Sequence, residues 1–267
     1  MTRDYSELWQ RAHGAVCSIT HQNGTVPIGQ GTGFLVGNWI ITNNHVIHGA
    51  GATHVKVQFV AEDGHSVTSG KLFTLATFQS LLVDGEPESS WDFALLNGDH
   101  AEFTNQPRLD LSSAPAPLIG APISFLGFHF EDQNLSIGAG ILASRYTRAA
   151  VAYLQLDASV NHGNSGGPVL DPNTGRVFGI VTRKATGLTK QFDELLASFD
   201  HNVAALSQAK AIMSIGGIDP IDGFRISQVQ LKGVSVELRR SANVGIGYAY
   251  DISKVRAALS KLGYNPP

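Results

Sequence analysis

The loop NHGNSGGPVL at residues 161–170 surrounds one serine, Ser165, with three glycines. Glycines in such a loop either form a simple turn or let the backbone approach a bound group closely. Two residues with matching chemistry precede the loop: His45 follows one apolar segment, and Asp92 begins another. A histidine can take the proton of a serine hydroxyl while a carboxylate holds the histidine ring, and the serine then attacks a carbonyl carbon. The three residues are far apart in the chain, so they can meet only through tertiary folding.

A second interpretation of the loop is the nucleophile elbow of α/β-hydrolases, because residues 163–167 (GNSGG) fit the pattern G-x-S-x-G. The elbow requires a helix directly after the serine, whereas Pro168 and the turn-like DPNTG follow here. It also requires the acid and the histidine downstream. His201, inside a predicted helix, is the only histidine after Ser165. This order disfavours an α/β-hydrolase or esterase.

The elements that must position these residues are mostly strands. Short apolar, β-branched segments separated by Gly, Asn, Asp or Pro recur from residue 14 to about 183, as in many-stranded β proteins. Four prolines within residues 106–122 predict a stiff connector between two halves. Apolar residues from Phe192 to Leu206 have helical spacing, and FRISQVQLKGVSVELRR at 224–240 predicts a return to strands.

Composition excludes several classes of protein. The 267 residues are 43% hydrophobic and 15% charged, as in ordinary globular chains. A net charge of -3 without a basic cluster argues against nucleic acid as a partner. No stretch has the length of a membrane span and the first residues lack a secretory signal, so we expect a cytoplasmic location and no membrane partner. The single cysteine, Cys17, is expected to be a buried structural thiol.

Several segments together resemble a known family. GTGFLV, IITNNHVI, DFALL, LQLDASVNHGNSGGPVL, VFGIVT and VGIGYAYDISKVRAAL resemble, in content and in order, trypsin-like (chymotrypsin-fold) serine proteases, closest to the HtrA-like branch. The resemblance covers residues 12–187 and 243–262. It implies an all-β fold of two six-stranded antiparallel β-barrels of the chymotrypsin type, with a C-terminal helix and an α/β insertion in the second barrel.

The resemblance also implies domain boundaries. The N-terminal segment and first barrel would occupy residues 1–105, and the inter-barrel connector residues 106–122. The second barrel would occupy residues 123–267, with the insertion at 188–242 and the C-terminal helix at 251–262. The sequence shows no counterpart of the peptide-binding PDZ module that usually follows the protease domain in HtrA-like proteins.

The resemblance implies a serine endopeptidase acting through an acyl-enzyme. His45 would be the general base, Asp92 would orient its ring, and Ser165 would be the nucleophile. The backbone N–H groups of Gly163 and Ser165 would form the oxyanion hole. The alternative is a catalytically silent peptide-binding or scaffold protein of the same fold, which the intact set of three disfavours.

Substrate recognition is expected from six further residues. By resemblance, Ser159 lies at the floor of the specificity pocket with Val160 beside it, and the facing wall is VTRK. His162 adjoins the oxyanion loop, and the remaining three would pair with an extended substrate as an added strand: Thr182, Arg183 and Lys184. The absence of a carboxylate there predicts a small or medium apolar residue before the cleaved bond, and the two basic residues leave an acidic preference open.

Asn164 predicts the mode of activation. Digestive relatives have an aspartate before the nucleophile, which pairs with a new N-terminal ammonium after precursor cleavage. A neutral amide cannot form that ion pair, so we expect no zymogen cleavage and control by loop order or by a partner. The insertion at 188–242 is either a lid, a docking surface for a regulatory protein partner, or mere surface decoration. We expect no cofactor and no metal, because His45 and His48 have no further ligand cluster beside them.

Overall fold

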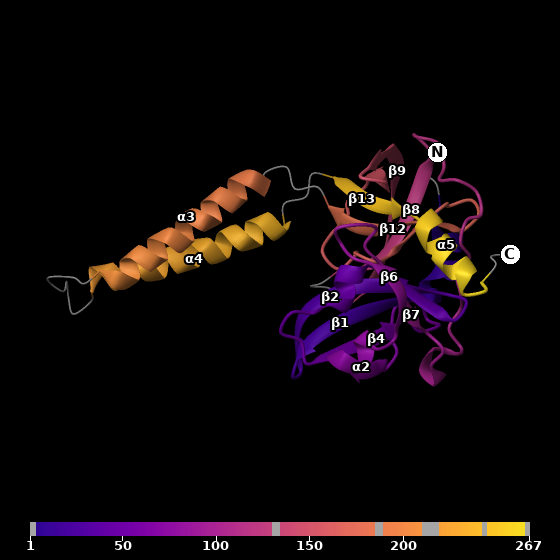
Figure 1. Cartoon of the computed structure of the whole chain (residues 1–267), viewed down its shortest axis with the longest axis horizontal. Helices are drawn as coiled ribbons and strands as arrows, with labels where there is room; N and C mark the ends of the chain where they lie inside the picture. Colours follow the sequence, from indigo (N-terminus) through magenta and orange to yellow (C-terminus); the bar gives the residue numbers. More distant parts are fainter. Residues whose placement is uncertain (1–3, 130–133, 185–188, 210–218, 242–244, 265–267) are drawn as a thin grey trace. The chain divides into compact units, whose positions relative to one another are not determined.

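The structure is a computed structural model that describes residues 4–129, 134–184, 189–209, 219–241 and 245–264 (Figure 1). The chain divides into two compact units. One consists of residues 1–184 and 245–267, and the other of residues 185–244.

The N-terminal half of the first unit is a curled, antiparallel, seven-stranded sheet with the order β5-β4-β1-β2-β3-β7-β6. Its strands are β1 (Val16–Asn23), β2 (Val26–Val36), β3 (Trp39–Thr42), β4 (His54–Phe59), β5 (Lys71–Thr74), β6 (Leu82–Glu86) and β7 (Phe93–Asn97). Short helical segments accompany them: α1 (Ser6–Ala12), η1 (His13–Ala15), η2 (Asn44–Ile47), α2 (Leu75–Gln79) and η3 (Ala101–Phe103). Cys17 on β1 is fully buried, and burial raises the pKa of its thiol far above the usual value, which makes it unreactive.

The C-terminal half of this unit is a closed six-stranded barrel with the order β10-β13-β12-β11-β8-β9. Its strands are β8 (Pro122–Phe128), β9 (Leu135–Arg148), β10 (Val151–Asp157), β11 (Pro168–Leu170), β12 (Val177–Lys184) and β13 (Ile246–Asp251). Helix α5 (Ser253–Lys261) buries Val255, Ala258 and Leu259. One hydrophobic cluster includes α5, Phe34 and Leu95 of the sheet, and Leu126 and Ile180 of the barrel. This shared core fixes the sheet against the barrel.

The predicted fold class is therefore confirmed, with one difference in strand count. The second barrel has the six expected strands, whereas the first half contains seven. The sheet ends on each side in a short edge strand, β5 or β6, which is paired with only one neighbour. With both edge strands counted, the sheet has one strand more than expected. Edge strands of four or five residues carry too little apolar alternation to be counted reliably from sequence.

The second unit is a pair of helices, α3 (Thr189–Gln208) and α4 (Pro220–Ser241). They run antiparallel (Figure 1), and an Asn202–Gln228 hydrogen bond of 3.0 Å and a Lys232–Asp200 ion pair join them. The helix predicted from Phe192 to Leu206 lies within α3.

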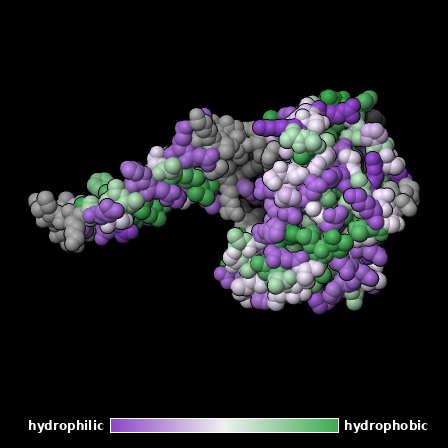
Figure 2. Space-filling view, viewed as in Figure 1, coloured by the Kyte–Doolittle hydropathy of each residue, from purple (hydrophilic) through white to green (hydrophobic). Residues whose placement is uncertain are grey.

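The strands predicted at 224–240 are wrong, because this segment belongs to α4. Asp219 accepts a hydrogen bond from the N–H of Ile221, and Pro220 occupies the first turn, where proline has no N–H to satisfy. The apolar residues that suggested strands are instead exposed along the helix, as the green surface of the hairpin in Figure 2 shows; examples are Phe224, Leu231 and Leu238.

Candidate active site

The Ser165 loop lies between β10 and β11, and both halves of the unit hold it. Thr32 on β2 is completely buried, its N–H donates to Ser165 O (2.8 Å), and its hydroxyl donates to Gly163 O (2.6 Å). The same hydroxyl accepts from the N–H of Phe128 on β8 (3.0 Å). A single threonine of the first sheet thus connects the loop to the second barrel.

Close packing explains why glycines follow the serine. Gly166 has φ +88°, and a Cβ on it would lie 2.1 Å from Thr32 O. A Cβ on Gly167 would lie 2.2 Å from Leu126 O. Only glycine fits at either position, so the glycines here serve a close backbone approach and not a simple turn.

Asn164 is completely buried and uses both ends of its amide inside the protein. Its Nδ2 donates to Phe128 O (3.2 Å), and its Oδ1 accepts from the N–H of Asn161 (2.8 Å). The side chain therefore holds the loop to β8 by neutral hydrogen bonds.

Asp92 precedes β7 and holds His45, which lies on η2. The carboxylate of Asp92 is completely buried, with Oδ2 2.7 Å from His45 Nδ1 and Oδ1 accepting from the His45 backbone N–H at 3.0 Å. Asn43 donates to the backbone oxygen of Asp92 (2.8 Å), and the Thr182 hydroxyl donates to Oδ2 (3.3 Å). Asp92 has a positive φ of 41°, which is uncommon for a residue other than glycine. Tertiary contacts hold this conformation.

The environment of His45 alters its basicity. Burial disfavours the charged ring, but the hydrogen bond and the charge of Asp92, together with the charge of Glu88, outweigh burial and raise the pKa of His45 above its usual value. The Nδ1 contact with a carboxylate favours a tautomer with the proton on Nδ1. The Nε2 atom is then the basic one.

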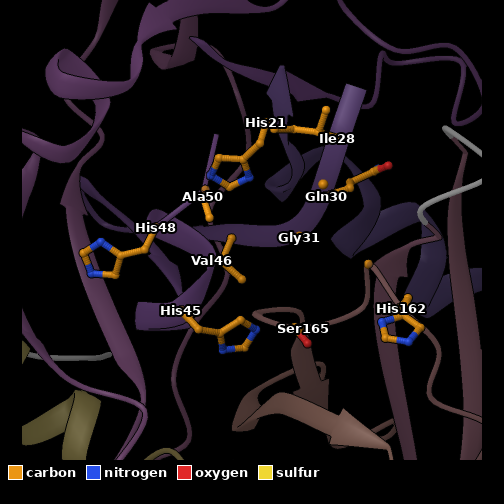
Figure 3. A pocket seen from close by; sticks show the side chains of 13 residues that line it. His21, Ile28, Gln30, Gly31, His45, Val46, His48, Ala50, His162 and Ser165 are labelled. Atoms are coloured by element: carbon orange, nitrogen blue, oxygen red, sulfur yellow. The ribbon is translucent and has the colours of Figure 1, made fainter. Parts of the chain in front are cut away.

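Ser165 and His45 line the same cavity, which has a volume of about 310 Å³ (Figure 3). The Ser165 hydroxyl donates to Thr182 O at 2.7 Å, and it makes no hydrogen bond to His45 in this structure. Within the described residues, no oxygen accepts a hydrogen bond from the N–H of Gly163 or of Ser165. Both amides of the expected oxyanion hole are therefore available to a ligand.

The residues expected to recognise substrate are more scattered. Ser159 is exposed, whereas Val160 is 1% exposed and belongs to the barrel core. A Cβ on Gly247 of β13 would lie 2.3 Å from Val160, so the side chain of Val160, expected beside the pocket floor, packs against that strand. His162 lines the 310 Å³ cavity.

The three expected strand-pairing residues lie at the end of β12. Thr182 is buried, at an irregularity in the pairing of β12 with β13. Arg183 pairs with Tyr248 and Lys184 with Gly247 through the backbone, and the side chains of Arg183 and Lys184 lie outside the described part of the structure.

Sequence reasoning missed Thr32, Asn43 and the side-chain role of Thr182. Asn43 stands two residues before His45, inside a segment that carried the resemblance, so its position was a usable signal. Thr32 also lies in a segment that carried the resemblance, GTGFLV, but its role could not be inferred from that position, because it depends on contacts with residues 96 and 131 positions away.

The described residues show neither a metal-binding cluster nor a membrane-spanning helix. No group of three or more His, Cys, Asp or Glu side chains among them could hold a metal ion. None of the helices they form is long and apolar enough to cross a membrane.

Comparison with known proteins gives the family. Residues 31–180 match the trypsin-like peptidase domain. The chain is 30% identical over 171 residues to bovine "Serine protease HTRA2, mitochondrial", covering 60% of this chain and 33% of the relative. It is 28% identical over 164 residues to "Probable periplasmic serine endoprotease DegP-like" of Chlamydia pneumoniae, covering 59% of this chain and 29% of the relative. The chain thus spans about a third of the length of these relatives.

Solved structures agree on the fold. A serine endoprotease from Yersinia pestis superposes with a TM-score of 0.53 at 25% identity, covering 69% of this chain and 59% of the other. The HtrA-type protease AlgW with a tripeptide superposes with a TM-score of 0.58 at 20% identity, covering 97% of this chain and 63% of the other.

The expected cytoplasmic location is wrong. Relatives are named as periplasmic or mitochondrial proteins, and these names point away from the cytoplasm. The expectation used the lack of a membrane-length stretch and of a secretory signal in the first residues, and neither observation determines the compartment. The named relatives are HtrA and DegP-like serine proteases, and the match over residues 31–180 shows that the chain belongs to the trypsin-like peptidase family.

Proposed function

We propose that this chain hydrolyses peptide bonds with Ser165 as nucleophile, His45 as general base and Asp92 as the group that orients His45. The proposal rests on two hydrogen bonds of the buried Asp92 carboxylate, 2.7 Å to His45 Nδ1 and 3.0 Å from the His45 backbone N–H. His45 lines the same cavity as Ser165. A carboxylate held in this way fixes the tautomer whose Nε2 can accept a proton.

The first step is a rotation of the Ser165 side chain. Its hydroxyl exchanges Thr182 O for His45 Nε2, between staggered rotamers. Nε2 takes the hydroxyl proton as the oxygen attacks the peptide carbonyl, and Asp92 stabilises the resulting imidazolium. Hydrogen bonds of apo active sites often tighten only when substrate binds.

The tetrahedral intermediate carries a negative oxygen, which the free N–H groups of Gly163 and Ser165 would bind. One such donor contributes roughly 100- to 1,000-fold in rate. His45 then returns its proton to the leaving amine, the carbon–nitrogen bond breaks, and Ser165 remains as an ester. Water, deprotonated by His45, hydrolyses that ester.

The acyl side of the substrate would extend along the end of β12. Pairing between β11 and β12 ends at Pro168 and Ile180. Beyond this point, Gly166 and Gly167 hydrogen-bond β12 at Val181, and the edge of β12 from Thr182 onward is proposed to hold an added strand. Ser159 is exposed near this region of the loop, and the preference for the residue before the cleaved bond stays a prediction.

Labelling with a fluorophosphonate tests this proposal. The wild type should be labelled, and Ser165→Ala and His45→Ala should not be. Ser260→Ala is a matched control, because Ser260 is an exposed serine on α5 and its loss should leave labelling unchanged. Equal labelling of all four proteins would contradict the assignment, and an unlabelled wild type would favour a silent peptide-binding protein.

We also propose that activity requires no new N-terminus. Both polar ends of Asn164 already have partners in a buried position, which supports a loop held without an ion pair. The rate of peptide cleavage should therefore be the same before and after trimming within residues 12–16. A requirement for trimming would contradict this part of the proposal.

The hairpin of α3 and α4 is our proposed surface for a regulatory protein. Phe224, Leu231 and Leu238 are exposed at seven-residue spacing on α4, which suits packing against another helix. Deletion of residues 188–242 should abolish the effect of such a partner while preserving cleavage of short peptides. If partner binding and cleavage are both unchanged by the deletion, the insertion is surface decoration.

A further inference from the structure

The cavity that contains Ser165 extends over the first sheet. Besides His45 and Ser165 its walls include His21 of β1, Ile28 of β2, Val46 of η2 and the following His48. No described residue of β12 lines it. The described residues of the strand proposed to hold the acyl part of the substrate are therefore not part of the cavity wall.

The chemistry of the reaction gives this cavity a role. His45 must protonate the leaving amine, so the leaving chain departs past the His45 ring. The cavity is lined by that ring and continues beyond it (Figure 3). Its position is that of the first residues after the cleaved bond.

His21 is the unusual residue of this cavity. Its side chain is 5% exposed, and its Nε2 atom is buried without a hydrogen-bond partner. Buried polar atoms nearly always have a partner, and an orphan in a site wall indicates a group that a ligand or water completes. The ring cannot swing away easily, because a Cβ on Gly49 would lie 2.1 Å from His21 Cδ2. His21 is thus an unsatisfied hydrogen-bonding group in the cavity wall, and a partner reaches its Nε2 atom only with a small movement of the ring or of Gly49.

We propose that His21 is a specificity-determining residue, and that its imidazole hydrogen-bonds a neutral polar side chain (Ser, Thr or Asn) within the first two residues after the cleaved bond. This inference rests on the proposed function and adds a preference on the leaving-group side. In the view of Figure 3, Val46 lies between the rings of His45 and His21. His45, Val46 and His21 all line the cavity, so we assign the contact with His21 to the first two residues after the cleaved bond.

The surroundings favour a neutral partner. Burial, and then the charge of His48, lower the pKa of His21, so its ring is neutral at pH 7. Among the lining residues there is no Asp, Glu, Lys or Arg to pair with a charged side chain. A hydroxyl or an amide can both donate and accept, and therefore suits either tautomer of a neutral imidazole. Ile28 and Val46 supply apolar contacts for the carbon atoms of the same side chain.

Matched peptide libraries test the proposal. The acyl side is randomised, and the first or second leaving-group residue is Thr in one library and Val in its twin, since these residues have nearly the same shape. Wild type should cleave the Thr library with a kcat/KM about 3- to 10-fold higher, as expected for one net hydrogen bond. His21→Leu should equalise the libraries, and His21→Gln should keep a preference for Thr. His54→Leu is the matched control, because His54 lies on β4 and does not line the cavity.

Fluorophosphonate labelling separates this inference from the function on which it rests, because the probe has no leaving-group peptide. A labelled wild type that cleaves both libraries equally would overturn the inference and leave water as the partner of His21. A preference for Asp that grows as the pH falls would overturn it too, because the ring would then act as a cation. A wild type that neither labels nor cleaves would overturn both proposals. If His21→Leu fails to fold and loses labelling, loss of the Thr preference in a labelled His21→Gln decides against the inference.

Discussion

Thr32→Val tests the link between the first sheet and the Ser165 loop. The substitution keeps the side chain's shape and removes a hydroxyl that is completely buried. Two backbone groups then lose their partner: Gly163 O, now accepting at 2.6 Å, and Phe128 N, now donating at 3.0 Å. Each buried orphan costs about 1–3 kcal/mol, and the added methyl group returns less than about 1 kcal/mol. The free energy of unfolding should therefore fall by about 1–6 kcal/mol.

The same substitution should also reduce the rate of acylation. The carbonyl of Gly163 lies in the chain between the two amides proposed to bind the oxyanion, and Thr32 fixes its direction. Loss of one oxyanion donor costs about 100-fold or more, so partial misorientation should lower kcat by about 10-fold.

Urea unfolding and single-turnover acylation measure the two effects. Thr32→Ser is the control, because it keeps the hydroxyl and should retain near wild-type kcat with a loss of about 1 kcal/mol. A Thr32→Val protein with wild-type stability would refute the reasoning that Gly163 O and Phe128 N destabilise the fold when they lose their hydrogen-bond partner. One that loses stability but keeps its full kcat would refute the link to the oxyanion site.

Three further predictions concern the same site. The pKa of His45 is raised and its neutral form is the base, so kcat/KM should rise with pH through a midpoint above the usual pKa of histidine. Asp92→Asn should lower that midpoint and reduce kcat by about 10,000-fold. Asn164→Asp should cost about 3 kcal/mol or more in thermal or urea unfolding, because an unpaired carboxylate would face Phe128 O in a completely buried position. Gly166→Ala should prevent folding to a labelled enzyme, since its Cβ would lie 2.1 Å from a backbone oxygen at a positive φ.

The sequence pointed to the residues proposed as reactive because each sits in a local context with its own signal. His45 and Asp92 adjoin apolar strands, and the glycines beside Ser165 are required by backbone contacts that the structure shows. Such signals are local, so a single sequence contains them.

Features that depend on distant packing were not predictable. Val160 is adjacent to the expected pocket floor in sequence, yet Gly247, from the far end of the chain, draws it into the core. His21 looked like one of 10 histidines until Gly49 and the cavity gave it a fixed place. The strand prediction for residues 224–240 was wrong for a different reason. The dense apolar residues of this segment fit both the helical and the strand period, and the helix start at Asp219 and Pro220 was the signal that distinguished a helix from a strand.

The hydrogen bonds that hold the Ser165 loop limit how the proposed activity could be regulated. Several hydrogen bonds hold the loop, among them Thr32 N–H to Ser165 O, the Thr32 hydroxyl to Gly163 O, Asn164 to Phe128, and Gly166 to Val181. At about 1 kcal/mol each, the loss of these four alone would leave roughly one molecule in 1,000 with a disordered loop. Rotation of Ser165 exchanges one hydrogen bond for another and has no comparable cost.

Control by a partner should therefore act on access to the cleft and not by ordering this loop. Amide hydrogen exchange measures the difference. The N–H groups of Gly166 and Gly167, which donate to Val181 O and Asn164 O, should exchange slowly both in the resting protein and after fluorophosphonate labelling. Fast exchange at rest that becomes slow on labelling would mean that the loop orders during activation. It would contradict the inference that hydrogen bonds already hold the loop in the resting protein.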